Sequence, residues 1–150
     1  MGRLFAIDWG ERRIGVAASD ELRILATPAG VITRRAGKRP PVAELLRRMD
    51  EIGEVDAVVM GLPLDGDGNE TPRCGEVRRV AAAITERSGR PVSFVDERYS
   101  TARTHRSLHE AGGKVGDHRH DIDALTAATL LQLVLNGGAV IAASSIVSED

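Results

Sequence analysis

Short apolar runs dominate the beginning of the chain. Residues 4–7 are apolar without alternation, which is typical of a strand buried on both faces. Gly10 and the charged residues after it indicate a turn, and residues 13–19 then predict a second strand. A third strand is expected near residues 24–32. The chain is therefore predicted to open with an antiparallel hairpin of residues 3–8 and 13–19, extended by a third strand.

The remaining pattern alternates between helical and strand spacing. In the first of the helical segments, Leu45, Leu46 and Met49 lie on one stripe. Helices are predicted over residues 42–52, 71–87, about 101–111 and 121–135, and strands over residues 57–60 and 92–95. A hairpin followed by alternating elements indicates an α/β fold with a mixed five-stranded sheet and helices on both faces. We expect one domain over residues 1–136, and the tail at 137–150 is either disordered or packed on the domain.

Composition limits the function classes. The chain has 150 residues, of which 42% are hydrophobic and 28% charged, as in ordinary globular proteins. A single cysteine allows no internal disulfide, and with no signal segment we expect a cytoplasmic protein. No apolar stretch reaches the roughly 20 residues of a membrane-spanning helix. The net charge of −2 does not by itself indicate a nucleic-acid partner.

Three acidic residues stand where predicted elements begin or end. Asp8 closes the first apolar run, Glu97 follows the strand at 92–95, and Asp123 lies in the first turn of the last helix. Taken singly, each has an ordinary explanation, such as a turn residue or a favourable charge at a helix start. Taken together, they could converge on one point at the carboxyl edge of the sheet. Such oxygen ligands suit Mg²⁺, and metal pairs can clamp the two oxygens of a cleaved phosphodiester.

The motifs resemble those of the YqgF family in order and spacing. They are AIDWGERRIGVAASD, VVMGLPLDGDG, VDERYSTARTHRSL and IDALTAATLLQ, together spanning about residues 3–135. YqgF proteins are small bacterial proteins described as pre-16S ribosomal RNA nucleases or as Holliday-junction-resolvase-like. The resemblance implies a ribonuclease H-like fold. The basic segment common before the last helix in relatives is here weaker and contains His118 and His120.

The resemblance also implies a set of site residues. The family's acidic triad, which is catalytic and metal-binding, matches Asp8, Glu97 and Asp123 with Mg²⁺ or Mn²⁺ as cofactor. Asp121 is the alternative third ligand, although the Ile-Asp pair directly before the alanine-rich helix favours Asp123. Substrate-binding positions match the residues Arg13, Arg98, Gly61 and Gly68, together with Pro63 of the same glycine-rich loop.

The leading interpretation is a metal-dependent nuclease that hydrolyses structured RNA and processes the end of pre-16S ribosomal RNA. Its expected partners are precursor rRNA and the small ribosomal subunit, and it would act as a monomer or homodimer. One alternative is a Holliday-junction resolvase acting on branched DNA. Another is an RNA-binding ribosome assembly factor whose acids hold only structural Mg²⁺. An actin-like ATPase is disfavoured, because charged residues follow Asp8 and the chain is short.

Three further motifs have simpler explanations. The basic segment at residues 34–41 is either a solvated loop or a phosphate-contacting loop. The segment at 65–69 resembles a calcium loop, but Glu70 replaces the required glycine, so a turn is expected. Cys74 has no histidine or second cysteine at a useful spacing, which gives a nucleophile or zinc site little support.

Overall fold

The computed structural model describes residues 2–35, 39–98, 119–138 and 140–142. Its strands are β1 (Arg3–Trp9), β2 (Arg13–Ser19), β3 (Ala26–Thr33), β4 (Val55–Leu62), β5 (Val92–Asp96) and β6 (Ile141–Ala142). Its helices are α1 (Val42–Ile52), α2 (Pro72–Ser88) and α4 (Arg119–Leu135). The helix predicted over 101–111 and the histidine at 118 lie outside the described residues. For residues 119–121 only the backbone is described, so the side chains of His120 and Asp121 are not placed.

The sheet has the predicted mixed topology. Its strand order is β3-β2-β1-β4-β5-β6. The β1–β2 and β2–β3 pairs are antiparallel, whereas β4 runs parallel to both β1 and β5. The five predicted strands are thus confirmed. A sixth strand of two residues comes from the tail and pairs antiparallel with β5, so the tail contributes to the sheet.

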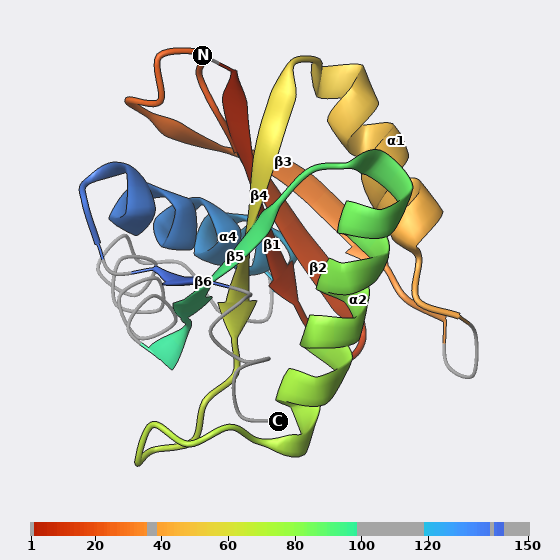
Figure 1. Ribbon diagram of the computed structural model, residues 1–150, viewed down its shortest axis with the longest axis vertical. Helices are drawn as coiled ribbons and strands as arrows, with labels where there is room; N and C mark the ends of the chain where they lie inside the picture. The colour runs from red at the N-terminus through yellow and green to blue at the C-terminus, as the bar shows by residue number, and fades with distance from the viewer. Residues whose placement is uncertain (1, 36–38, 99–118, 139, 143–150) are drawn as a thin grey trace.

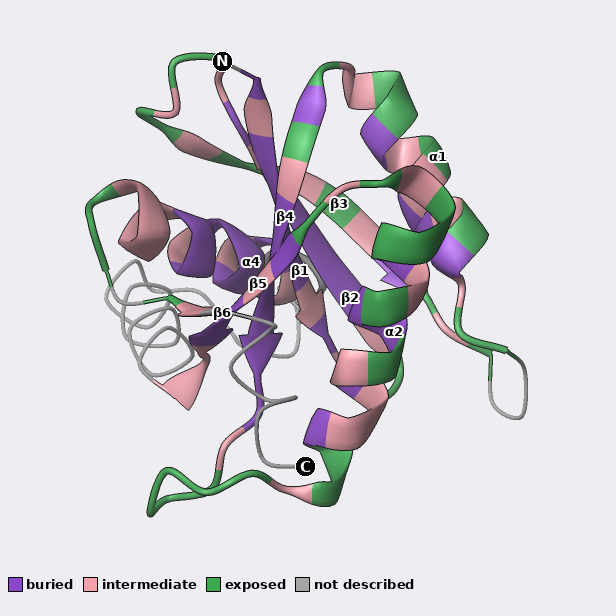
Figure 2. Ribbon diagram, in the orientation of Figure 1, coloured by how far each residue is buried: buried purple, intermediate pink, exposed green. Residues whose placement is uncertain are grey.

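Helices cover both faces of the sheet, as Figure 1 shows. On one face α1 and α2 pack through Leu45, Met49, Val77 and Ile84, all fully buried. The burial of the inward positions follows the helical spacing of the sequence. The other face is covered by α4, whose residues Ala127, Ala128, Leu130 and Leu131 pack against Ala6, Ala17 and Val59. Small side chains on this face of the sheet allow α4 to approach closely, and Figure 2 shows the resulting continuous buried interior.

Proline and the local caps fix where α2 begins. Thr71 is the N-cap residue, and its hydroxyl donates to the Pro63 carbonyl at 2.7 Å. Pro72 occupies the first helical turn, where a missing N–H costs nothing. Cys74 is buried beneath this cap, and its thiol lies 3.4 Å from the same carbonyl, which gives it a structural role. This cap ties the loop after β4 to the start of α2.

The loop at residues 65–69 is a turn, as expected. The Asp65 carboxylate accepts hydrogen bonds from the backbone N–H groups of Asp67 and Asn69, both at 2.9 Å. This pattern is an Asx-type turn, which leaves that carboxylate committed to its own backbone. No described helix is long and apolar enough to cross a membrane.

Candidate functional site

Two carboxylates meet at the carboxyl edge of the parallel strands. Asp8 lies near the end of β1, and Glu97 directly follows β5. The two strands flank β4, so that both side chains reach over its last residues. The Asp8 and Glu97 side chains are hydrogen-bonded to each other, which requires one of them to carry a proton. A pair of this kind holds a proton because burial disfavours the charged carboxylates, and because adjacent charges repel.

Gly61 makes room for Glu97 on β4. A Cβ atom at this position would lie 3.1 Å from Oε2 of Glu97 and 2.9 Å from Cδ1 of Leu130. Both distances are tighter than ordinary packing allows, so any larger residue would push the carboxylate or α4 away. The glycine that the resemblance assigned to substrate binding thus has a clear positioning role.

Asp123 approaches the pair from the opposite element, α4. Its charge helps to raise the pKa of Asp8, so the three acids share one electrostatic environment. Gly15 makes this possible, because a Cβ atom there would lie 1.9 Å from the backbone oxygen of Asp123. Gly15 is also the cross-strand partner of Asp8. Because Gly15 has no side chain, the N-terminal part of α4 can pack directly on β2, beside the end of the strand that carries Asp8.

The pKa values of Asp8 and Glu97 reflect their burial and the charges around them. Burial, followed by the charges of Glu97 and Asp123, raises the pKa of Asp8 to about 7 from an ordinary value of 3.8. Burial also raises the pKa of Glu97, against the opposing charge of Arg73 and the hydrogen bond from Asp8. Near neutral pH the site therefore holds a proton that a cation could replace.

The two arginines that the resemblance assigns to substrate binding each form an ion pair within the protein. Nε of Arg13 lies 2.7 Å from Oδ2 of Asp123. Arg98 forms an ion pair with Asp96 at 2.6 Å and donates to the carbonyl oxygens of Asp65 and Gly66. The Arg98 guanidinium also lies under Gly68, where a Cβ atom would be 3.5 Å away. Arg13 thus orients Asp123, and Arg98 fastens the loop after β4 to the end of β5.

Sequence reasoning missed Arg73, which stands in the first turn of α2. Its guanidinium donates to the carbonyl of Trp9 at 3.0 Å, one residue after Asp8. From there its charge lowers the pKa of both Asp8 and Glu97. The side chain is exposed. No motif marks this position, because its relation to the acids arises only when α2 packs across the end of β1.

The family model RuvX, described as Holliday junction resolvase, matches residues 2–137. The chain belongs to the RuvX family. Its curated relatives include a protein of Paramagnetospirillum magneticum that is 38% identical over 89% of this chain and 85% of its own length. Another, from Cutibacterium acnes, is 42% identical over 89% of this chain and 82% of its own length. Both carry the name "Putative pre-16S rRNA nuclease", which agrees with the resemblance to YqgF proteins.

A solved structure supports the fold of this RuvX family member. Thermus thermophilus RuvC in complex with Holliday junction substrate matches with a TM-score of 0.54. The match covers 91% of this chain and 97% of the RuvC chain at 16% identity. Similarity at this level concerns the fold alone, and it confirms the expected ribonuclease H-like architecture.

The donor chemistry of this RuvX site suits a hard divalent cation. Asp8 and Glu97 offer adjacent carboxylate oxygens, which Mg²⁺ and Mn²⁺ prefer as ligands. Among the described residues, no three acidic, histidine or cysteine side chains form a ready metal-binding group. Asp123 is instead held by Arg13. The two side chains whose oxygens could share one cation are therefore Asp8 and Glu97, with Asp123 beside them.

Proposed function

We propose that this chain is a divalent-metal-dependent nuclease that hydrolyses phosphodiester bonds in structured RNA. The proposed substrate is the end of precursor 16S ribosomal RNA, and the proposed location is the cytoplasm. The observation that carries this proposal is the meeting of Asp8, Glu97 and Asp123 from β1, the end of β5 and α4 at one edge of the sheet. The names of the curated relatives support the choice of RNA as substrate.

Each acidic residue has a defined part in this proposal. Asp8 and Glu97 would hold Mg²⁺ or Mn²⁺, with Asp123 as the third carboxylate. A cation bound there supplies an activated water and neutralises charge that develops on the phosphate. Arg13 holds the Asp123 carboxylate in place through its 2.7 Å ion pair.

Arg73 is the group best placed to meet the substrate phosphate. It is anchored by one hydrogen bond to the Trp9 carbonyl and is otherwise exposed at the site. A guanidinium has five N–H donors in a fork that matches phosphate oxygens. Arg73 can therefore bind Trp9 and still present donors to a phosphate beside Asp8.

A second candidate function is cleavage of branched DNA. The description of the family model, Holliday junction resolvase, favours it. The acidic site would serve either substrate equally well, because the chemistry at phosphorus is the same. The two candidates differ in whether a single strand end or a junction reaches the site.

Cleavage assays distinguish these readings. Purified protein is incubated with a precursor 16S rRNA fragment and, separately, with a four-way DNA junction, each with Mg²⁺, with Mn²⁺ and with chelator. We expect metal-dependent cleavage of the RNA, and we expect Asp8→Asn and Glu97→Gln to abolish it. The matched control is Asp50→Asn on α1, whose exposed carboxylate pairs only with Arg90 at 3.0 Å among the described side chains.

The outcomes separate three functions. Cleavage of the junction but not of the RNA would replace the RNA proposal with the resolvase. RNA binding that survives Asp8→Asn, without any cleavage by the wild type, would indicate an assembly factor that uses the acids for structural Mg²⁺. Full activity in Asp8→Asn would overturn the assignment of the site itself.

A further inference from the structure

A cavity of about 380 Å³ lies between the end of β3 and the start of α1. Its lining includes four arginines and one acid, namely Arg34, Arg35, Arg39, Arg48 and Glu44. It is separate from the carboxylate site, since none of the three acids lines it. A hollow lined by several guanidinium groups is suited to an anion with multiple oxygen acceptors.

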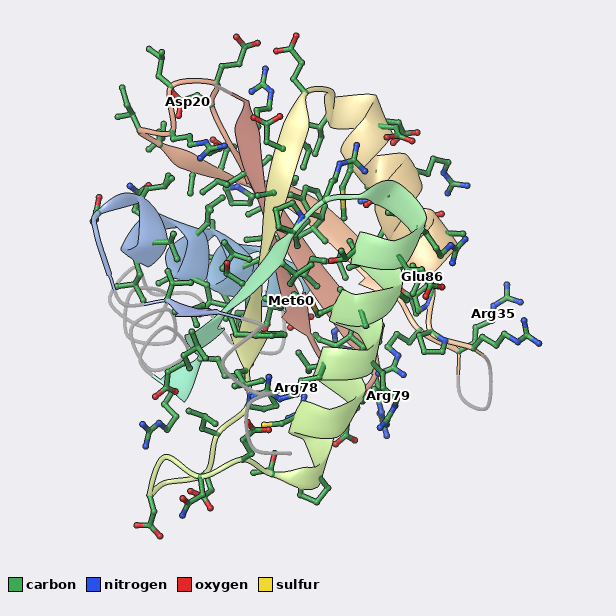
Figure 3. The ribbon with its side chains drawn as sticks, viewed as in Figure 1. Asp20, Arg35, Met60, Arg78, Arg79 and Glu86 are labelled. Carbon is green, nitrogen blue, oxygen red and sulfur yellow. The ribbon has the colours of Figure 1, made fainter. Side chains whose placement is uncertain are left out.

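Two of the four arginines have no acidic partner among the residues that the structure describes. Arg34 pairs with Glu76 at 3.0 Å, and Arg48 pairs with Glu44 at 3.3 Å. For Arg35 and Arg39, no described acidic side chain lies within ion-pair distance. Both are exposed, and Figure 3 shows Arg35 extending from the β3–α1 connection away from the body of the molecule. The cavity therefore has a net positive charge available to a ligand.

The rim of the cavity is fixed to the same sheet edge as the acids. Arg34 donates through its backbone N–H to the Arg12 carbonyl at 2.8 Å and through Nη1 to the Gly10 carbonyl at 2.9 Å. Its guanidinium also stacks over the Trp9 ring, 4.7 Å from the centroid. These contacts hold the segment after β3 against the turn that follows Asp8.

The β-ladder gives the separation of the two sites. Val31 of β3 pairs with Gly15 of β2, which pairs with Asp8 of β1. Two strand spacings, or roughly 10 Å, separate these backbone positions. Asp8 faces α4, whereas Glu44 and Arg48 place the cavity on the α1 side of the sheet, so a strand that reaches both sites must pass around the ends of the strands.

We propose that this arginine-lined cavity binds a backbone phosphate of the nucleic-acid substrate, away from the bond that meets the acidic site. Arg35 and Arg39 make the contacts, while Arg34 and Arg48 shape the cavity. The inference rests on the proposed nuclease function for its ligand, a phosphodiester strand. It adds a site that fixes where along that strand the acids act.

Binding without cleavage tests the cavity directly. A fluorescently labelled RNA hairpin with single-stranded ends is titrated in chelator with wild type, Arg35→Gln and Arg39→Gln, over a series of salt concentrations. Each variant should bind several-fold more weakly at moderate salt, and the slope of log K against log salt should fall by ~0.7–0.9 for each lost phosphate contact. Arg39→Lys should recover part of the affinity, because it restores the charge but not the guanidinium fork.

Arg87→Gln is the matched control. Arg87 is also exposed and its loss changes the net charge equally, but it lies in the last turn of α2, away from the cavity. This variant should bind with the wild-type salt slope. Slopes for Arg35→Gln and Arg39→Gln that match the Arg87→Gln slope would overturn the proposal.

Cleavage assays then separate this inference from the proposed function. Arg39→Gln should raise KM for a long RNA with little change in kcat. It should have progressively less effect as the RNA is shortened on the cavity side, and no effect once the RNA is too short to reach both the acidic site and the cavity. If the wild type cleaves but Arg39→Gln behaves like Arg87→Gln on all of these RNAs, the cavity assignment fails alone. If the wild type cleaves nothing while the binding defects persist, the nuclease proposal fails and the cavity assignment stands.

Discussion

Replacing Asp8 by asparagine should stabilise the metal-free protein near pH 8. The ionised carboxylate is buried beside Glu97 and Asp123, and this environment raises its pKa from 3.8 to about 7. Near pH 8 the native state therefore holds a charge that the unfolded chain solvates better. An asparagine amide removes this charge and can still donate a hydrogen bond to Glu97. The substitution that should abolish cleavage is thus expected to raise the melting temperature.

The pKa of Asp8 sets the size of the effect. A rise from 3.8 to about 7 costs the ionised native state up to ~4 kcal/mol, at about 1.4 kcal/mol for each tenfold change in the ionisation constant. Partial exposure of Asp8 to solvent lowers this figure, and we take ~2 kcal/mol as the lower end. For a chain of this length each kcal/mol shifts the melting temperature by roughly 2–4 °C. The expected gain is therefore about 4–16 °C.

The sign of the pH dependence follows from the direction of the shift. Because the pKa is higher in the folded than in the unfolded chain, the stability linked to Asp8 is fully present below about pH 4 and is lost as pH rises through 7. The gain from Asp8→Asn should be largest near pH 8 and should fall by about half near pH 5. Asp50→Asn is the control, and thermal melts in chelator are the measurement. A gain that is absent, or equal at both pH values, would refute the reasoning.

The effect of metal on the melting temperature is a second test of the same carboxylates. Mg²⁺ or Mn²⁺ should raise the melting temperature of the wild type near pH 8, since a ligand at 100 times its Kd stabilises the native state by about 2.7 kcal/mol. Asp8→Asn should lose most of this response, because it removes one of the two adjacent carboxylates. An equal response in both proteins would mean that the cation binds elsewhere.

Two further substitutions test the positioning of the acids. Gly15→Ala places a methyl group 1.9 Å from the backbone oxygen of Asp123. It should therefore lower the free energy of unfolding by about 1–3 kcal/mol through overpacking, and it should reduce cleavage. Gly66→Ala is the matched control for the melts and the assays, because nothing lies within 4 Å of a Cβ atom there. Arg73→Gln should lower kcat/KM by about 10- to 100-fold, as expected for the loss of one charged hydrogen bond. It should also move the pH dependence of stability to higher pH, because Arg73 lowers the pKa of Asp8. Unchanged kinetics and an unchanged pH dependence would exclude a role for Arg73 at the site.

Much of the fold could be predicted because local pattern and tertiary packing agree. Strands β1, β2 and β4 carry unbroken apolar runs, and both of their faces are buried by helices. The stripe on α1 gives its bounds and its buried residues, Leu45 and Met49, correctly. The sixth strand was missed because two residues have no periodicity, and only pairing with β5 defines them as a strand.

The sequence predicts which acidic residues belong to the site better than it predicts how they are brought together. Chain positions at strand ends indicated Asp8 and Glu97, since parallel strands bring their carboxyl ends to one edge. The position of Asp123 depends instead on Gly15, whose lack of a side chain lets α4 pack closely on β2. The spacing of residues in the sequence does not predict this contact. Arg73 is likewise defined only by packing, because α2 must cross the end of β1 before its guanidinium reaches Trp9.

The arginines show why residue type alone does not locate a substrate contact. Arg13 and Arg98 match the motif, yet both guanidinium groups bind internal acids, Asp123 and Asp96. Arg13 holds Asp123 beside Asp8 and Glu97 through Nε, and Arg98 holds Asp96 and the loop after β4. Both arginines therefore help to keep the site in order, and their binding of substrate stays a prediction. In the function proposed above, further contacts to the nucleic-acid strand come from exposed arginines in the first turn of α2 and around the cavity at α1, because no described acid lies within ion-pair distance of them.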